Sequence, residues 1–247
     1  MKNRFGMMTA ALLAAAVLTG CSPSTNKQNS NTPAPSAETT QDAQITGAFE
    51  INADLTSAKL PGDAQKAFDK ALDGMTGTAY SPIVLLAQQV VSGKNYSILC
   101  MEQTTVPDAE PELHIITIYE DLDGNASITE DTLFDLSAVA GVSASASIEP
   151  DAEGAYETNT EFTAEDIPED ASSSLEKALD GLTGADYQAA ALLGTQVTSG
   201  TNYAMLCLVT PVVPDGEAYS TWSVVTVYQS LDGTCEITSV YDIDPAA

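Results

Sequence analysis

Few residues in this chain of 247 could do chemistry, and they are unevenly placed. His114 is the only histidine, and we expect it to face solvent from a strand. Asp121, Asp123 and Asn125 could offer oxygen ligands to calcium, but an EF-hand loop needs glycine at its sixth position, and here Gly124 comes fourth. The segment is therefore predicted to be a turn, and we expect neither a metal site nor a cofactor.

The charge of the chain excludes one class of partner. There are 35 acidic and 8 basic residues, for a formal charge of −27, and Lys177 is the only lysine or arginine after Lys94. Nucleic acid is excluded as a partner, because phosphate binding needs a basic footprint. No pair of carboxylates stands out as a general acid and base, so we do not expect an enzyme. With 44% hydrophobic residues, the chain can still bury a sizeable core.

The amino terminus has the form of an export signal. Lys2 and Arg4 precede an apolar run over residues 7–18, which is short for a membrane-spanning helix. The run ends in Leu-Thr-Gly-Cys, which resembles a bacterial lipobox. The resemblance implies a signal peptide over 1–20 and a diacylglycerol on Cys21, which would anchor the protein to the cell membrane on its extracellular or periplasmic side. A plain secretory signal with an accidental cysteine is the alternative.

The rest of the chain contains two copies of one module. A shift of 107 residues aligns residues 70–96 with 177–203, and 16 of these 27 pairs are identical. A period this long predicts two separate domains rather than a solenoid. The expected divisions are an unfolded Ser- and Pro-rich tether at 21–44, domain 1 at 45–136, a linker at 137–153 and domain 2 at 154–247.

Each module is predicted to pack one helix on a four- to five-stranded antiparallel sheet, an α+β fold. In the first module Asp63 can cap a helix whose apolar residues recur at i, i+3, i+4, i+7 and i+8 from Ala64, and Gly74 can end it. A first strand is expected near Phe49. Short turns separate the later strands, which are predicted over residues 83–91, 95–101, 112–119 and 126–133.

One predicted hairpin has a five-residue signature. Residues 89–93 read Gln-Val-Val-Ser-Gly and resemble the Gln-x-Val-x-Gly motif of the cystatins. The order of elements is similar to the cystatin fold, and Gly47 lies where that family has its amino-terminal glycine. The second copy has the same segment in register, but with Thr198 where the family motif has valine. The hairpin residues are Gln89, Val90, Val91, Ser92 and Gly93 in the first copy and Gln196, Val197, Thr198, Ser199 and Gly200 in the second.

The resemblance implies a reversible inhibitor of papain-like cysteine proteases. In that family the amino-terminal arm, the first hairpin and a second hairpin with Pro-Trp enter the cleft of the enzyme together. Here the second hairpin position reads Leu-Asp-Gly at 122–124 and again at 231–233, and the sole tryptophan, Trp222, lies on the preceding predicted strand. The arm before Gly154 continues into the linker, so we expect inhibition from the first module only.

Two other interpretations stay open. The signature could be only a hairpin whose composition suits folding, and the protein could be a non-inhibitory cell-surface adhesion or ligand-binding module on the same fold.

Cys207 and Cys235 are expected on strands with one strand between them, too far apart for a disulfide. We therefore predict free, buried thiols in a monomer that binds a protein partner.

Overall fold

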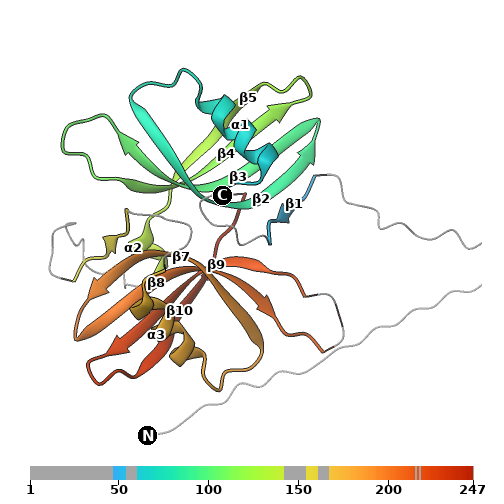
Figure 1. Ribbon diagram of the computed structural model, residues 1–247. Helices are drawn as coiled ribbons and strands as arrows, with labels where there is room; N and C mark the ends of the chain where they lie inside the picture. The colour runs from blue at the N-terminus through green and yellow to red at the C-terminus, as the bar shows by residue number, and fades with distance from the viewer. Residues whose placement is uncertain are drawn as a thin grey trace, which may run out of the picture. The chain divides into compact units, whose positions relative to one another are not determined.

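The computed structural model describes residues 47–53, 60–141, 154–160, 167–214, 216 and 218–246. Within them the chain forms two antiparallel sheets of five strands each and three helices, so the predicted α+β class is confirmed (Figure 1). Several predicted features lie outside the described residues. They are the signal peptide at 1–20, Cys21, the tether at 21–44 and residues 142–153 of the linker.

The first sheet holds its strands in chain order, and all neighbouring strands are antiparallel. The predicted first strand is confirmed, since Phe49 pairs with Gln89. Strands β2 and β3 meet at Ser92, so residues 89–93 form the end of a hairpin as expected. The strands are β1 (Phe49–Ile51), β2 (Thr78–Val91), β3 (Gly93–Thr104), β4 (Glu112–Asp121) and β5 (Ala126–Leu133).

The second sheet repeats this order, from β6 at one edge to β10 at the other. Its hairpin between β7 and β8 includes the second copy of the signature. The duplication seen in the sequence is thus a duplication of the whole sheet. The strands are β6 (Glu157–Thr158), β7 (Ala185–Val197), β8 (Gly200–Pro211), β9 (Thr221–Ser230) and β10 (Cys235–Asp242).

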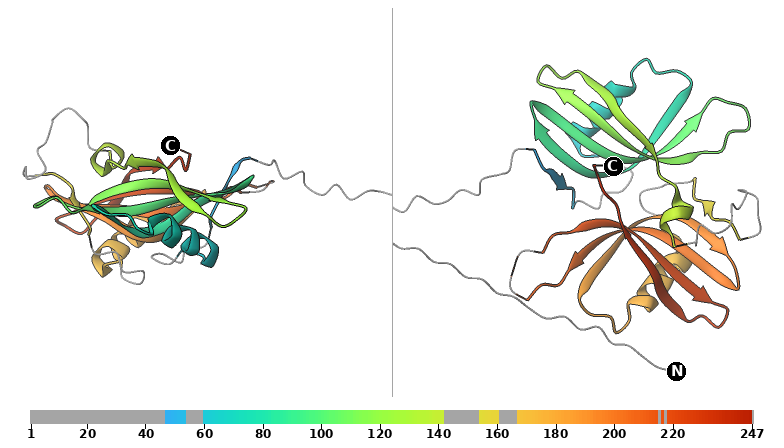
Figure 2. Two further views of the ribbon diagram at one scale, coloured as in Figure 1. Left: turned by 90° about the horizontal axis from the view of Figure 1, so that it is seen from above. Right: turned by 180° about the vertical axis from the view of Figure 1, so that it is seen from behind.

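Each copy has one long helix, α1 (Gly62–Leu72) or α3 (Glu169–Leu179), which lies against its own sheet (Figure 2). The predicted apolar stripe of α1 is confirmed, and it includes the buried Phe68. The predicted cap is wrong: Pro61 occupies the N-cap position, and Asp63 lies in the first turn, where the helix dipole favours a carboxylate. No helix within the described residues has both the length and the apolar character needed to cross a membrane.

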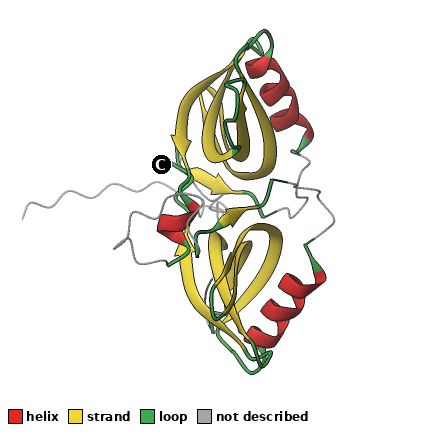
Figure 3. Ribbon diagram, turned by 90° about the vertical axis from the view of Figure 1, so that its left-hand side faces the viewer, coloured by secondary structure: helices red, strands yellow, loops and turns green. Residues whose placement is uncertain are grey.

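Alternate residues of the strands face two different cores. In β3, Ile98 and Cys100 pack with α1, whereas Leu99 and Met101 belong to a core on the other face. Figure 3 shows α1 and α3 each on one side of its curved sheet. A helix therefore covers only one of the two apolar faces that each sheet presents.

The faces turned away from the helices form one core, named here the shared core. Helix α2 (Leu136–Val139), at the start of the expected linker, adds Leu136 to it. The expectation of two separate domains was wrong, because strands with continuous apolar runs need cover on both faces. The buried residues of the shared core are Ile83, Val84, Leu86, Leu99, Met101, Leu113, Ile115, Phe134, Leu136 and Ala140 from the first half, and Ala190, Ala191, Leu193, Ala204, Leu206, Leu208, Trp222, Val224 and Ile243 from the second.

The three cysteines of the described part are free, which confirms the prediction for Cys207 and Cys235. Strand β9 lies between β8, which holds Cys207, and β10, which holds Cys235, so the expected separation is confirmed. Cys100 and Cys207 are buried. Cys235 is only half-buried, because it begins a strand at the edge of the sheet.

Candidate functional site

Three segments come together at one end of the first sheet: the arm at Gly47, the hairpin at 89–93 and the turn at 122–124. We name this set the first tip, and its equivalent, Gly154 with 196–200 and 231–233, the second tip. Gln89 connects the arm to the hairpin. Its Nε2 donates to the Gly47 carbonyl at 2.5 Å, and its Oε1 accepts from Asn95 Nδ2 at 2.6 Å.

The second tip has the same clamp. Gln196 Nε2 donates to the Gly154 carbonyl, and Asn202 Nδ2 donates to Gln196 Oε1 at 2.8 Å. Both ends of each glutamine amide are therefore used within the fold. The same two hydrogen bonds occur in both copies, and they fix the arm against the base of the hairpin.

The glycine that ends each signature is required by close packing. A Cβ atom on Gly93 would lie 2.2 Å from the Glu120 carbonyl oxygen and 2.9 Å from the ring of Tyr119. Tyr119 Oη also donates to the Ser92 carbonyl at 3.0 Å, so the ring covers the hairpin from β4. Gly200 repeats the arrangement at the second tip. Tyr119 of β4 thus packs against the neighbouring hairpin of β2 and β3.

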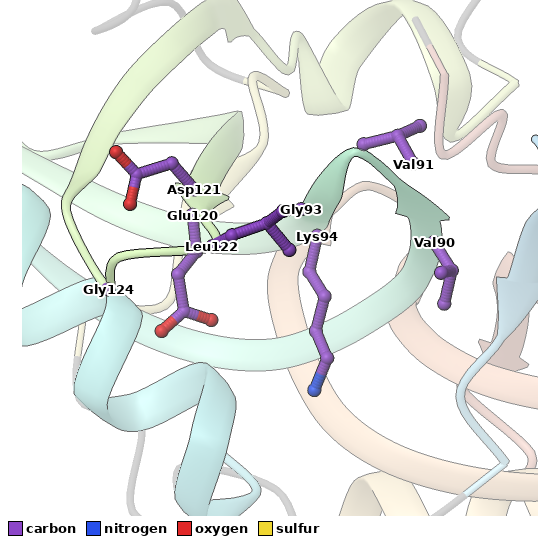
Figure 4. A pocket seen from close by; sticks show the side chains of 8 residues that line it. All are labelled: Val90, Val91, Gly93, Lys94, Glu120, Asp121, Leu122 and Gly124. Carbon is purple, nitrogen blue, oxygen red and sulfur yellow. The ribbon is translucent and has the colours of Figure 1, made fainter.

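The hairpin of the first tip presents apolar side chains to solvent. Val90 is 51% exposed, Val91 is 40% exposed, and Leu122 on the neighbouring turn is 85% exposed. Hairpin and turn line an open depression of about 370 Å³, with Lys94 and Glu120 among its walls (Figure 4). Exposed apolar side chains beside a depression lined by side chains of both charges suit the docking of a protein surface.

Hydrogen bonds within the turn occupy the carboxylate of Asp121. Its Oδ1 accepts from the backbone N–H groups of Asp123 and Asn125, each at 2.9 Å, and its Oδ2 accepts from Asn125 Nδ2 at 2.9 Å. The side-chain bond from Asn125, followed by the backbone bonds, lowers the pKa of Asp121. The predicted turn is confirmed.

At the second tip a different residue fills this role. Ser230 replaces Asp121, and Asp232 accepts from Ser230 Oγ at 2.5 Å and from the Thr234 N–H at 3.0 Å. The bond from Ser230, with those from Thr234, lowers the pKa of Asp232 to about 2. Both turns therefore keep a charged carboxylate at neutral pH that is used locally.

A buried tyrosine supports the wall of the depression. Tyr96 Oη donates to Glu120 Oε2 at 3.1 Å, and burial, followed by this bond, raises the pKa of Tyr96. The phenol of Tyr96 therefore stays protonated, and it holds the carboxylate of Glu120 in place. On the same wall, Lys94 Nζ lies 3.4 Å from Asp63 Oδ2 at the start of α1.

The remaining aromatic residue of interest is not at a tip. Trp222 is 1% exposed in the shared core, and its Nε1 donates to the Asn52 carbonyl of the other copy at 2.9 Å. The sequence showed Leu-Asp-Gly in place of Pro-Trp, but the exposure of its leucine was not predicted. An exposed leucine heads both turns, Leu122 and the 90% exposed Leu231, and an apolar residue before Asp-Gly was the available signal.

The expectation for His114 was wrong. Its side chain is only 12% exposed, with Nδ1 2.6 Å from Asp131 Oδ1 and Nε2 2.7 Å from Glu102 Oε2. It lies on the face of the sheet that packs against α1, because it pairs with Cys100 in the strand register. This cluster is separate from both tips.

Both tips therefore keep the predicted hairpin and arm in contact, whereas Cys21 lies outside the described residues. The depression is lined by apolar and charged side chains that can contact a protein surface. Comparison with models of known protein families gives no match, and comparison with curated protein sequences gives none either.

Proposed function

We propose that the protein is a lipid-anchored, non-enzymatic binding protein whose first tip reversibly inhibits papain-like cysteine proteases. One observation carries the proposal: the arm, the signature hairpin and the following turn, which are distant in sequence, are held together with their apolar side chains exposed. The resemblance to cystatins assigns these three segments to the inhibitory wedge.

The geometry favours tight docking for two reasons. The hairpin is held by Gln89 and by the ring of Tyr119, so little conformational entropy is lost when it enters a cleft. Val90, Val91 and Leu122 offer apolar area, and burying one such side chain fully contributes roughly 1.5–3 kcal/mol.

The anchor belongs to the same proposal. A diacylglycerol on Cys21, with residues 21–44 as a tether, would hold the tips outside the cell membrane on the extracellular or periplasmic side. The lipobox-like residues 18–21 support it. A secreted protease is then the natural partner.

The turn sequence favours a second candidate. Residues 122–124 lack Pro-Trp, so the protein could be a non-inhibitory surface adhesion or ligand-binding module that uses the same exposed valines and leucines. Under that proposal the two tips would bind one partner class, because Leu122 and Leu231 are exposed alike.

A titration of the whole chain against papain tests the proposal. The whole chain is needed, because an isolated copy would expose its half of the shared core. We expect inhibition at micromolar concentration or below, and Val91→Asp should raise the inhibition constant about 30-fold or more, since it places a charge in the interface.

The matched control is Thr198→Asp, which makes the same change at the exposed equivalent position of the second tip. It should leave inhibition unchanged. No inhibition by the wild-type chain at about 10 µM, or equal losses in both variants, would favour the second candidate instead.

A further inference from the structure

A polar cluster lies on the α1 side of the first sheet, away from the first tip. Glu102 in β3 lies directly opposite Glu112 in β4, and His114 follows two residues later on the same face. Asp131 of β5 and Tyr80 of β2 complete it. Two glutamates opposite each other on one face repel, so the pairing is costly unless a positive charge lies near.

The hydrogen bonds of the cluster fix the orientation of the histidine ring. Tyr80 Oη donates to Asp131 Oδ2 at 2.5 Å, and the other oxygen of Asp131 lies 2.6 Å from His114 Nδ1. When Nδ1 donates to that carboxylate, a neutral imidazole has its lone pair on Nε2. Carboxylates hold metal-binding histidines in this way.

The second ring nitrogen is left without an aligned partner. Nε2 of His114 is buried and lies 2.7 Å from Glu102 Oε2, yet the contact does not have the direction of a hydrogen bond. In the neutral ring this places a lone pair against a carboxylate oxygen. A cation between the two atoms would turn that repulsion into coordination.

The three side chains match the ligand set of a borderline transition metal. His114 and the carboxylates of Glu102 and Glu112 each offer one ligand atom, and these atoms all lie within 4.8 Å of one another. Zinc binds imidazole nitrogen and carboxylate oxygen at about 2.0–2.2 Å. Glu112 is exposed, so the site opens to solvent and water can fill the remaining position.

The second copy serves as an internal comparison. The positions equivalent to Glu102, Glu112 and His114 hold Val209, Thr221 and Ser223 in the same register. The sheet forms there without the histidine or the carboxylates: Val240 stands where Asp131 does, and only Tyr80 has a like counterpart, Tyr187. The fold does not require these charged residues, which argues for a role that only the first copy has.

We propose that Glu102, Glu112 and His114 bind a divalent transition-metal ion, for which Zn²⁺ is the best fit, and that Asp131 is a positioning residue. This site is independent of the proposed protease inhibition. It also differs from the sequence expectation, which gave no metal site, because the three residues meet only through the register of β3 with β4.

Zinc binding by the whole chain, prepared without a histidine tag, tests the proposal. Titration calorimetry in about 1 mM Mg²⁺, which occupies non-specific acidic sites, should give one Zn²⁺ per chain with micromolar or tighter affinity. His114→Gln should abolish this binding, and Glu112→Gln, at an exposed position, should weaken it at least about tenfold. Asp131→Asn should weaken it about 10- to 100-fold without removing a ligand.

The control and a second readout keep the result clear if one variant folds poorly. Glu130→Gln changes an exposed acidic residue next to Asp131 in β5 and should leave the affinity for Zn²⁺ unchanged. Since the chain has one histidine, its imidazole ¹⁵N signals report only His114, and the Nε2 signal should shift with Zn²⁺. Unchanged ¹⁵N signals with both nitrogens protonated, or binding that His114→Gln does not affect, would overturn the proposal.

Discussion

Replacement of Trp222 by phenylalanine tests whether the two copies form one folding unit. The indole is 1% exposed, and its N–H donates to the Asn52 carbonyl of the other copy. Phenylalanine removes the N–H donor of this hydrogen bond, which costs about 1–3 kcal/mol, and the smaller ring leaves a void. We expect Trp222→Phe to lower the free energy of unfolding by about 2–4 kcal/mol in total.

Urea unfolding followed by far-UV circular dichroism measures this loss. Fluorescence is unsuitable, because Trp222 is the only tryptophan and the variant removes it. Tyr219→Phe changes an aromatic side chain that is 76% exposed, and this control should shift the free energy by less than about 0.5 kcal/mol.

Hydrogen exchange decides where the loss is felt. If the shared core joins the copies, slow amides of β3 in the first copy should exchange faster in Trp222→Phe, although the substitution lies in the second copy. The reasoning is refuted if only amides of β7 to β10 exchange faster, or if unfolding separates into two transitions of which one is unchanged.

Further predictions concern a glycine, two thiols and a turn. Gly93→Ala should lower the melting temperature by several degrees through the clash with backbone, whereas Ser92→Ala should not; equal melting temperatures would contradict the packing argument. In a Cys21→Ser chain at pH 8, Cys235 should react with a disulfide reagent within minutes. Burial raises the pKa of Cys207 to about 12, so only about one thiol in 10⁴ is ionised, and a rapid reaction there would contradict its burial. NMR titration of Asp232 should give a pKa of about 2. The lowered pKa means that the charged carboxylate stabilises the fold at pH values above its ordinary pKa of 3.8, and that this stabilisation is lost as the pH falls toward 2. A measured pKa of 3.8 would show that the hydrogen bond from Ser230 is absent.

Local patterns predicted the elements well. The apolar spacing from Ala64 predicted α1, and the glycine turns predicted the hairpin order of the strands. The signature hairpin and Gly47 were predicted as parts of one site, and a hydrogen bond joins them. These features depend on neighbours in sequence or on a duplicated motif, which a single chain displays.

The features that sequence reasoning missed depend on register or on packing between copies. The continuous apolar run over residues 83–87 is typical of a strand buried on both faces, but it does not show that the other copy covers the second face. His114 reads as an isolated polar residue until β3 and β5 bring Glu102 and Asp131 beside it. Asp63 resembled a cap because the pattern could not show that Pro61 is the N-cap residue and that the helix begins at Gly62.

The apolar face that each half of the chain buries against the other has an evolutionary implication. A one-repeat ancestor with the same surface would have needed a second polypeptide to cover it, so we expect that ancestor to have been a homodimer. On that inference, gene duplication would have fused the protomers, so that a covalent connection replaced affinity between separate chains. Once fused, the halves were free to diverge, which fits a first half that has His114 where the second has Ser223.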